Sequence, residues 1–343
     1  MSIQVIGIDL GKSNFHLVAH DRKGNSLFRK KLSRKQLIQF LSDTPPTTIA
    51  FEACGGAHWL GRLCLKIGHS VKLLPPQYVR PYVKGNKNDF IDADAIAEAS
   101  QRPSMRFVEV KSEDAQLITV IYRVRQGYIK DRTACMCRIG ALLLEFGVSL
   151  PQGHATMKQL FTWLTANAPE LPPALHIELS GLHEYYKYLN EQIKVQDDKL
   201  TRHVARSADG QLLHAIPGIG VLTASQCMAE LGNVKQFKNG RNLAAWLGLV
   251  PHQHSTGGKP RLLGISKRGN KHLRTLFIHG ARAILARPEK TGAIFGKWLV
   301  QLRASKPFNV VCVALANKLA RIVWAVLRTK EAFNAEKLQS EFA

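Results

Sequence analysis

The stretch VIGIDLGKSN, residues 5–14, ends a short apolar run at a single aspartate, Asp9, and follows it with a glycine turn. NFHLVAHD, residues 14–21, then resumes β-branched and aromatic residues, so the two runs predict an N-terminal β-hairpin. Asp9 has three interpretations: it belongs to a nucleotide's phosphate loop, it holds a metal ion over a nucleic acid, or it merely ends a strand. The surrounding sequence has to decide among them.

The segments that follow the hairpin alternate between helix and strand patterns. Helical spacing appears in KQLIQFLSD (35–43) and in HWLGRLCLKIG (58–68), whereas TTIAFEA (47–53) and HSVKLLP (69–75) are typical of strands. Strands that alternate with helices predict an α/β domain with a central mixed sheet.

Four carboxylates of this region stand where a metal site would need them. Asp9 and Glu52 end predicted strands, and Asp89 and Asp92 lie three residues apart in KNDFIDADAIAEA, which is typical of a helix N-terminus. Acidic residues also favour helix starts for electrostatic reasons alone, so the pair by itself does not decide. The set of four favours a divalent-metal site for phosphodiester chemistry. Asp94 projects from another helical face, and we expect it to be a solvated or capping charge.

Charge and composition point to a polyanionic partner. The 343 residues carry a net charge of +23 and 45% hydrophobic residues, which suits about two globular domains that bind nucleic acid. By this reading no apolar run approaches the roughly 20 residues that cross a bilayer, and the N-terminus lacks a signal-peptide pattern. We therefore expect a cytoplasmic protein without a membrane partner. Six scattered cysteines predict reduced, buried thiols.

The middle of the chain changes character near residue 111. Residues 113–147 have apolar positions at three- and four-residue steps, and the pattern returns in residues 177–207 after a loop rich in proline and small residues. Two long helices of this kind predict either an antiparallel hairpin within the chain or a coiled coil between protomers.

The last region is strongly basic and holds two candidate phosphate-binding motifs. Between Gly232 and Pro288 there is no aspartate or glutamate. IPGIG, residues 216–220, predicts the turn of a helix-hairpin-helix, in which Gly218 and Gly220 bring backbone N–H groups to a phosphate.

The second motif, residues 248–274, places Ser255 and Thr256 before two glycines and a lysine. From the residues alone, a phosphate-binding loop is favoured over a nucleophile, because a hydroxyl needs activation. The cations expected to contact nucleic acid here are Lys259, Arg261, Lys267, Arg268, Lys271 and Arg274.

Five ordered motifs, IGIDLGKSNFHLVAHD, FEACGG, KNDFIDADAIAEA, IPGIGVLTA and the serine-containing segment, resemble those of DEDD-type transposases of bacterial insertion sequences, the group that includes the Piv invertase. The resemblance implies a RuvC-like domain of the ribonuclease H fold at 1–110, a helical coiled-coil region at 111–208 and a mainly helical transposase domain at 209–343. It also implies that Asp9, Glu52, Asp89 and Asp92 bind Mg²⁺, with Mn²⁺ as an alternative.

The same resemblance implies a serine nucleophile that forms a covalent DNA–phosphoserine intermediate, in a composite site shared between protomers. Many members place serine directly before the glycine, where this chain has Thr256, so Ser255 is our choice because a primary hydroxyl is less hindered, and Thr256 remains the alternative. The implied partners are donor and target DNA, an element-encoded guide RNA and other copies of the chain, as a dimer or a tetramer. The implied place of action is the bacterial nucleoid.

Three rival functions remain to be separated. Sugar kinases and actin-like ATPases begin with a loop similar to residues 9–14, but their further phosphate and adenosine loops are missing. A RuvC-like Holliday-junction resolvase would use the carboxylates with metal-activated water and no serine. A catalytically silent RNA-binding scaffold would use neither group.

Overall fold

The computed structural model describes residues 2–85 and 88–336. The chain divides into two compact units, Met1–Asp114 and Ala115–Ala343, and each is described by itself. The division into three regions that the sequence predicts remains a prediction.

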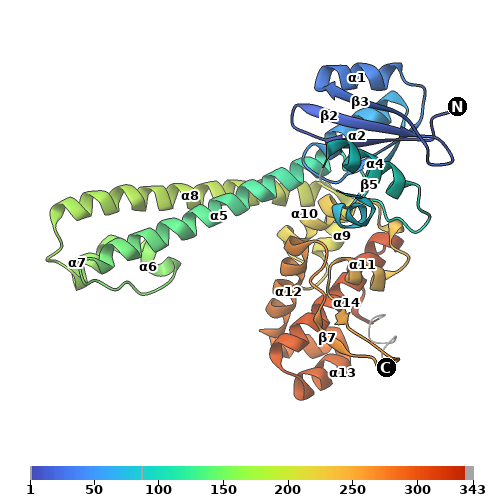
Figure 1. Ribbon diagram of the computed structural model, residues 1–343. Coiled ribbons are helices and arrows are strands. Elements are labelled where there is room, and N and C mark those ends of the chain that lie inside the picture. Colours follow the sequence, from blue (N-terminus) through green and yellow to red (C-terminus); the bar gives the residue numbers. More distant parts are fainter. Residues whose placement is uncertain (1, 86–87, 337–343) are drawn as a thin grey trace. The chain divides into compact units, whose positions relative to one another are not determined.

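The N-terminal unit is built on a five-stranded mixed sheet with the strand order β3-β2-β1-β4-β5 (Figure 1). Strands β2 and β3 continue antiparallel from β1, whereas β4 and β5 run parallel to it. The strands are β1 (Val5–Leu10), β2 (Asn14–His20), β3 (Ser26–Ser33), β4 (Thr48–Glu52) and β5 (Ser70–Leu74). The sheet confirms the predicted α/β fold, and its order is consistent with a RuvC-like domain.

Two helical layers cover this sheet, because successive side chains of each strand point to opposite faces. Ile6 and Ile8 of β1 face a core shared with α1 (Arg34–Asp43) and α2 (Ala57–Ile67). Val5 faces the other side, where α4 (Asp89–Ser100) packs together with α3 (Pro76–Val79) and the 3-10 turn η1 (Arg80–Tyr82). The second face is the one that carries the candidate site.

Glycine at position 7 sets how close α4 lies to β1. A Cβ on Gly7 would collide with the carbonyl of Ala93 and with Ala97, both on α4. Its absence lets the helix rest directly on the strand, which brings the first turn of α4 beside the end of β1.

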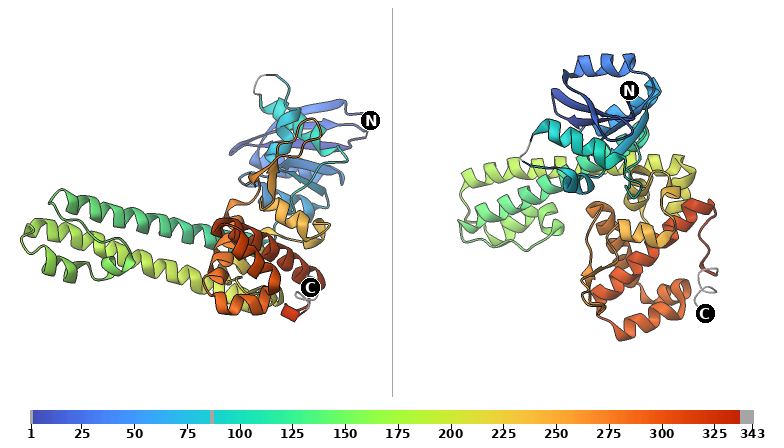
Figure 2. Two further views of the ribbon diagram at one scale, coloured as in Figure 1. Left: turned by 90° about the horizontal axis from the view of Figure 1, so that it is seen from below. Right: turned by 45° about the vertical axis from the view of Figure 1, so that its right-hand side comes forward.

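The C-terminal unit begins with a long antiparallel helical pair, α5 (Glu113–Leu144) and α8 (Pro173–Arg206), which lie side by side in both figures (Figure 1, Figure 2). Arg125 of α5 pairs with Asp197 of α8, and Arg132 Nη1 donates to Asn190 Oδ1 at 2.8 Å. The predicted hairpin within the chain is therefore present. The prediction that a loop alone connects the two helices is wrong in part.

Two short helices replace much of that loop. They are α6 (His154–Lys158) and α7 (Leu160–Asn167), which pack on the far end of the pair in a small apolar core. The core forms because Met157, Leu160 and Leu164 are buried against α5 and α8.

The remaining helices enclose the largest apolar core of the chain, to which α14 contributes a continuous buried face. They are α9 (Ala208–His214), α10 (Val221–Glu230), η2 (Val234–Gln236), α11 (Gly240–Trp246), α12 (Lys271–Leu285), α13 (Pro288–Ser305) and α14 (Phe308–Thr329). A two-stranded hairpin, β6 (Pro251–Gln253) and β7 (Leu262–Ile265), lies between α11 and α12.

The expectation that no apolar run is long enough to cross a bilayer is wrong for α14. By length and composition this helix could span a membrane, with a mean hydropathy of 1.9 over its most apolar window. However, 61% of that window is buried inside the protein, as in the core helix of a soluble domain. Such a helix is weak evidence for a membrane span.

Candidate metal centre and nucleic-acid-binding motifs

Asp9 and Glu52 end neighbouring parallel strands on the same face of the sheet. Strands β1 and β4 pair with Ile8 opposite Phe51, so Asp9 and Glu52 leave the sheet at one edge. Asp9 follows Val5 and Gly7 on the face that α4 covers, and Glu52 follows Ala50 on that face. Both carboxylates are half-buried.

Asp89 and Asp92 lie in the first turn of α4, as the sequence predicts. Asn88 caps this helix, because its side chain accepts from the N–H of Phe90 at 2.9 Å. Since Gly7 lets α4 rest on β1, the helix N-terminus presents both carboxylates to the end of that strand.

Two of the four carboxylates, Asp9 and Glu52, have raised pKa values. Burial raises the pKa of Asp9, and the charges of Asp92 and Asp89 raise it further. Burial likewise raises the pKa of Glu52, followed by the charges of Asp9 and Asp92. Groups that disfavour one another's negative charge in this way would be relieved by a divalent cation, and oxygen-rich sets suit Mg²⁺ or Mn²⁺. The donor set therefore fits a divalent metal ion.

A histidine that the sequence reasoning missed also belongs to this cluster. His16 of β2 lies opposite Asp9 in the strand register, and its Nδ1 is 3.4 Å from Asp89 Oδ2. One ligand atom each from Asp9, His16 and Asp89 all lie within 4.8 Å of one another. The signal was available in the hairpin, because a register that pairs Phe15 with Leu10 puts His16 opposite Asp9.

The Asp94 side chain is 40% exposed, in keeping with a partly solvated charge, but it also has a partner. Its Oδ1 lies 2.8 Å from Nε2 of the buried His20, on the same covered face of the sheet. The sequence did not indicate this pairing, because helical periodicity alone does not show that β2 runs beneath α4.

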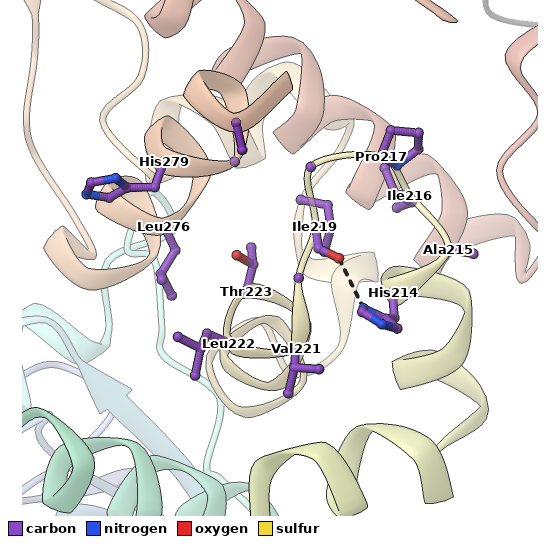
Figure 3. Close-up of a pocket in the computed structure, with 14 residues that line it drawn as sticks. His214, Ala215, Ile216, Pro217, Ile219, Val221, Leu222, Thr223, Leu276 and His279 are labelled. Carbon is purple, nitrogen blue, oxygen red and sulfur yellow. Dashed lines mark hydrogen bonds between the residues drawn. The ribbon is translucent and has the colours of Figure 1, made fainter. Parts of the chain in front are cut away.

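The predicted helix-hairpin-helix turn lies between α9 and α10, beside a pocket of about 580 Å³ (Figure 3). Gly218 takes a positive φ of 81°, and a Cβ there would collide with Gly280 and Ile284 of α12. Gly220 is exposed at the start of α10, where the first helical N–H groups have no partner within the helix. Of the two glycines, Gly220 is therefore the one open to a phosphate, whereas Gly218 shapes the turn.

His214 closes the inner side of this turn. Its Nδ1 lies 3.3 Å from the carbonyl oxygen of Ile219, the contact drawn in Figure 3. Leu276 and His279 of α12 line the opposite wall of the pocket (Figure 3).

Ser255 and Thr256 lie in the loop that connects β6 with β7, residues 254–261. Ser255 Oγ accepts from Gln253 Nε2 at 2.8 Å and from the N–H of Arg261 at 3.2 Å. The neighbouring Thr256 forms an isolated bridge with Lys259 through its backbone. Both hydroxyl-bearing residues are exposed.

Two glycines with positive φ, Gly248 and Gly269, let the turn after β7 pack closely against the segment before β6. A Cβ at Gly248 would collide with Arg268, and one at Gly269 would collide with the carbonyl of Trp246. The basic turn that contains Lys267 and Arg268 is thereby fixed against the start of β6.

Five of the six predicted cations are exposed, and Arg274 is the exception. The exposed ones are Lys259, Arg261, Lys267, Arg268 and Lys271. Arg274 is buried, and its Nη1 donates to the carbonyl oxygens of Leu247 at 3.0 Å and Arg268 at 3.2 Å. We correct its predicted nucleic-acid contact to a structural role, because the guanidinium joins the carbonyl at the end of α11 to that of the basic turn.

Two family profiles match the chain. The one described as "Transposase", of the DEDD type, matches residues 6–148, and the one described as "Transposase IS116/IS110/IS902 family" matches residues 210–294. Taken with the carboxylate cluster and the basic helical unit, they define a DNA transposase, an enzyme that catalyses DNA strand transfer.

Relatives of nearly full length narrow the class. The chain is 47% identical to the transposase for insertion sequence element IS1328 of Yersinia enterocolitica, covering 95% of this chain and 97% of that one. It is 39% identical to the transposase of IS1111A from Coxiella burnetii, over 96% and 91%. The pilin gene-inverting protein of Moraxella bovis is 24% identical, over 97% and 98%. The chain belongs to the IS110/IS116 family of insertion-sequence transposases.

Proposed function

We propose that this transposase inserts and excises its element through a RuvC-like metal centre formed by Asp9, Glu52, Asp89 and Asp92. The observation that carries the proposal is the convergence of these carboxylates from two strands and one helix, expressed in the raised pKa values of Asp9 and Glu52. When bound, Mg²⁺ or Mn²⁺ would stabilise the charge on the attacking and leaving oxygens of a phosphodiester. The four carboxylates would hold the ions in place, since they come from two paired strands and the helix that packs on them.

Ser255 is the proposed nucleophile. Its oxygen would form a bond to a DNA phosphorus while the phosphorus–sugar oxygen bond breaks, leaving a phosphoserine and a sugar hydroxyl. Two N–H donors, from the Gln253 side chain and the Arg261 backbone, point at Ser255 Oγ and would stabilise negative charge on it. Thr256 lacks such an arrangement of donors among the hydrogen bonds that the described residues make, which supports Ser255 over Thr256.

The nucleic-acid partners of the proposal are donor DNA, target DNA and an element-encoded guide RNA. Exposed cations on both sides of the serine hairpin and the N–H groups near Gly220 support backbone binding without sequence readout, which leaves specificity to base pairing. In the composite site that we propose, Ser255 of one protomer attacks DNA bound at the carboxylates of another. This requires at least a dimer, and a tetramer would hold two duplexes. The reaction would take place in the cytoplasm, at the nucleoid.

A trapping experiment tests the chemistry. The full-length protein is incubated with its copurified RNA, element-end DNA and Mg²⁺, and covalent protein–DNA adducts are separated under denaturing conditions. We expect an adduct that is lost in Ser255→Ala and in Asp92→Ala but retained in Thr256→Val. Cleavage without an adduct would instead identify a resolvase that uses water.

Sequencing the RNA that copurifies with the protein tests the guide. The expected product is one structured RNA from the element, with segments complementary to both DNA partners. Random cellular RNA would contradict guidance while leaving the serine chemistry in place.

A further inference from the structure

His16 occupies a position next to the carboxylates that a structural histidine would not need. It is buried in the middle of a paired strand, on the face covered by α4, and its ring packs edge-on against Phe90 with centroids 4.8 Å apart. Burial and this contact fix the ring, so that Nδ1 faces Asp89.

The separation of His16 Nδ1 from Asp89 Oδ2, 3.4 Å, is longer than a charge-assisted hydrogen bond of about 2.7–2.9 Å. Two adjacent ligands on one octahedral ion, each about 2.1 Å from it, lie roughly 3.0 Å apart. At 3.4 Å the two atoms are close enough to share one ion without a tight hydrogen bond between them. Asp89 is exposed and can close the remaining few tenths of an ångström by rotating its side chain.

We infer that His16 is a direct nitrogen ligand of the metal centre, in addition to the carboxylates; this rests on the proposed function. The imidazole binds through Nδ1 in its neutral form, with the ring proton on Nε2. A nitrogen ligand changes which ion the site prefers, because Mg²⁺ is a hard ion that keeps oxygen ligands and water, whereas Mn²⁺ accepts an imidazole nitrogen more readily. The site therefore selects Mn²⁺ over Mg²⁺ more strongly than an all-carboxylate set would.

Mn²⁺ itself serves as the probe, because it is paramagnetic. The full-length protein is loaded with Mn²⁺ alone, without nucleic acid, and electron spin echo modulation reports nitrogen-14 nuclei bound to the ion. We expect nitrogen modulation in the wild type and its loss in His16→Gln. Binding of Mn²⁺ should weaken by about tenfold or more in that variant. Binding of Mg²⁺ should weaken less, so the Mn²⁺/Mg²⁺ affinity ratio falls.

The matched control is His20→Gln, on the same strand and the same face but paired with Asp94. It should keep the nitrogen modulation. A wild-type echo with oxygen surroundings only, or modulation that persists in His16→Gln, would overturn the inference.

Asp9→Asn separates failure of this inference from failure of the metal centre. If Mn²⁺ binding depends on Asp9 but shows no nitrogen, the carboxylate centre stands and His16 is not a ligand. If Mn²⁺ does not bind, or binds equally to Asp9→Asn, the proposed metal centre fails and the inference fails with it.

Discussion

Replacing Gly7 by alanine tests how the fold builds the metal centre. A Cβ at this position would meet Ala97 N at 2.7 Å and Ala97 Cβ at 2.8 Å, with the carbonyl of Ala93 nearer still, whereas ordinary contacts begin at 3.4 Å. These atoms belong to the backbone or to a short side chain, so no side chain can rotate away. Helix α4 must retreat from β1 by roughly 1 Å to admit one methyl group.

Two effects of different size follow from that retreat. Overpacking of this kind costs about 1–3 kcal/mol of the free energy of unfolding. Because Asp89 and Asp92 move with α4 while Asp9 and Glu52 stay on the sheet, the carboxylate set also opens. A misplacement of about 1 Å can reduce a rate on the order of 100-fold. Strand transfer should therefore suffer far more than stability.

Urea unfolding and strand transfer on element-end DNA measure the two effects separately. Gly140→Ala is the matched control, since Gly140 lies in α5 with no atom within 4 Å of a built Cβ. That variant should gain about 0.5–1 kcal/mol, as alanine does in a helix interior, and keep its activity. If Gly7→Ala unfolds at the wild-type urea concentration and transfers strands at the wild-type rate, the close contact of α4 with β1 does not position the centre.

Three further outcomes follow from the structure. Burial and neighbouring carboxylates raise the pKa of Asp9, so the folded state keeps that proton to higher pH than the unfolded state. Without divalent ions, stability should therefore fall as the pH rises from the ordinary carboxyl range through the raised value, and urea unfolding should show a smaller fall in Asp9→Asn. Lys271→Ala should lower DNA affinity and reduce the slope of log affinity against log salt by about 1, whereas Arg274→Met should leave the slope unchanged and cost about 1–3 kcal/mol of stability. The predicted burial of the thiols is wrong for Cys54 and Cys137, which are exposed, so a thiol reagent should label these two in the folded chain and the other cysteines only after unfolding.

The local sequence pattern was enough to predict four strands of the N-terminal sheet, but not the edge strand β3. The hairpin of β1 and β2 has alternating apolar residues and a clear glycine turn, so its existence follows from the sequence. Strand β3, SLFRKKLS, carries three consecutive cations and exposes most of its residues, which hides its alternation. Charged edge strands resist pairing with other chains, so the property that protects this strand also conceals it.

In the candidate metal centre too, some residues could be predicted from the sequence and others could not. Each of the four carboxylates stands at the end of its own element or in a first helical turn, which a one-dimensional pattern can indicate. His16 and the pairing of His20 with Asp94 depend on strand register and on the side from which α4 covers the sheet. The hairpin turn indicates the register, but the sequence does not show the side from which α4 covers the sheet.

In the C-terminal unit, the sequence indicated which residues have suitable chemistry, but not which of them are exposed. The serine segment was recognised by its residue types, but its closure into β6–β7 depends on pairing across a register shift. Arg274 looked like one more cation of a basic run. Its burial follows from the amphipathic pattern of α12, where Leu273 and Phe277 face the core and Arg274 lies beside them.

The contribution of α14 to the core also bears on how the protein is made. Leu213 of α9 and the buried face of α14 share one core, although about 115 residues separate the ends of the two helices. At roughly 5–20 residues per second, a ribosome takes on the order of 6–23 s to cover that distance. During this interval the nascent α9 and α10 lack the apolar face of α14, so the core of this unit can close only after α14 has been synthesised.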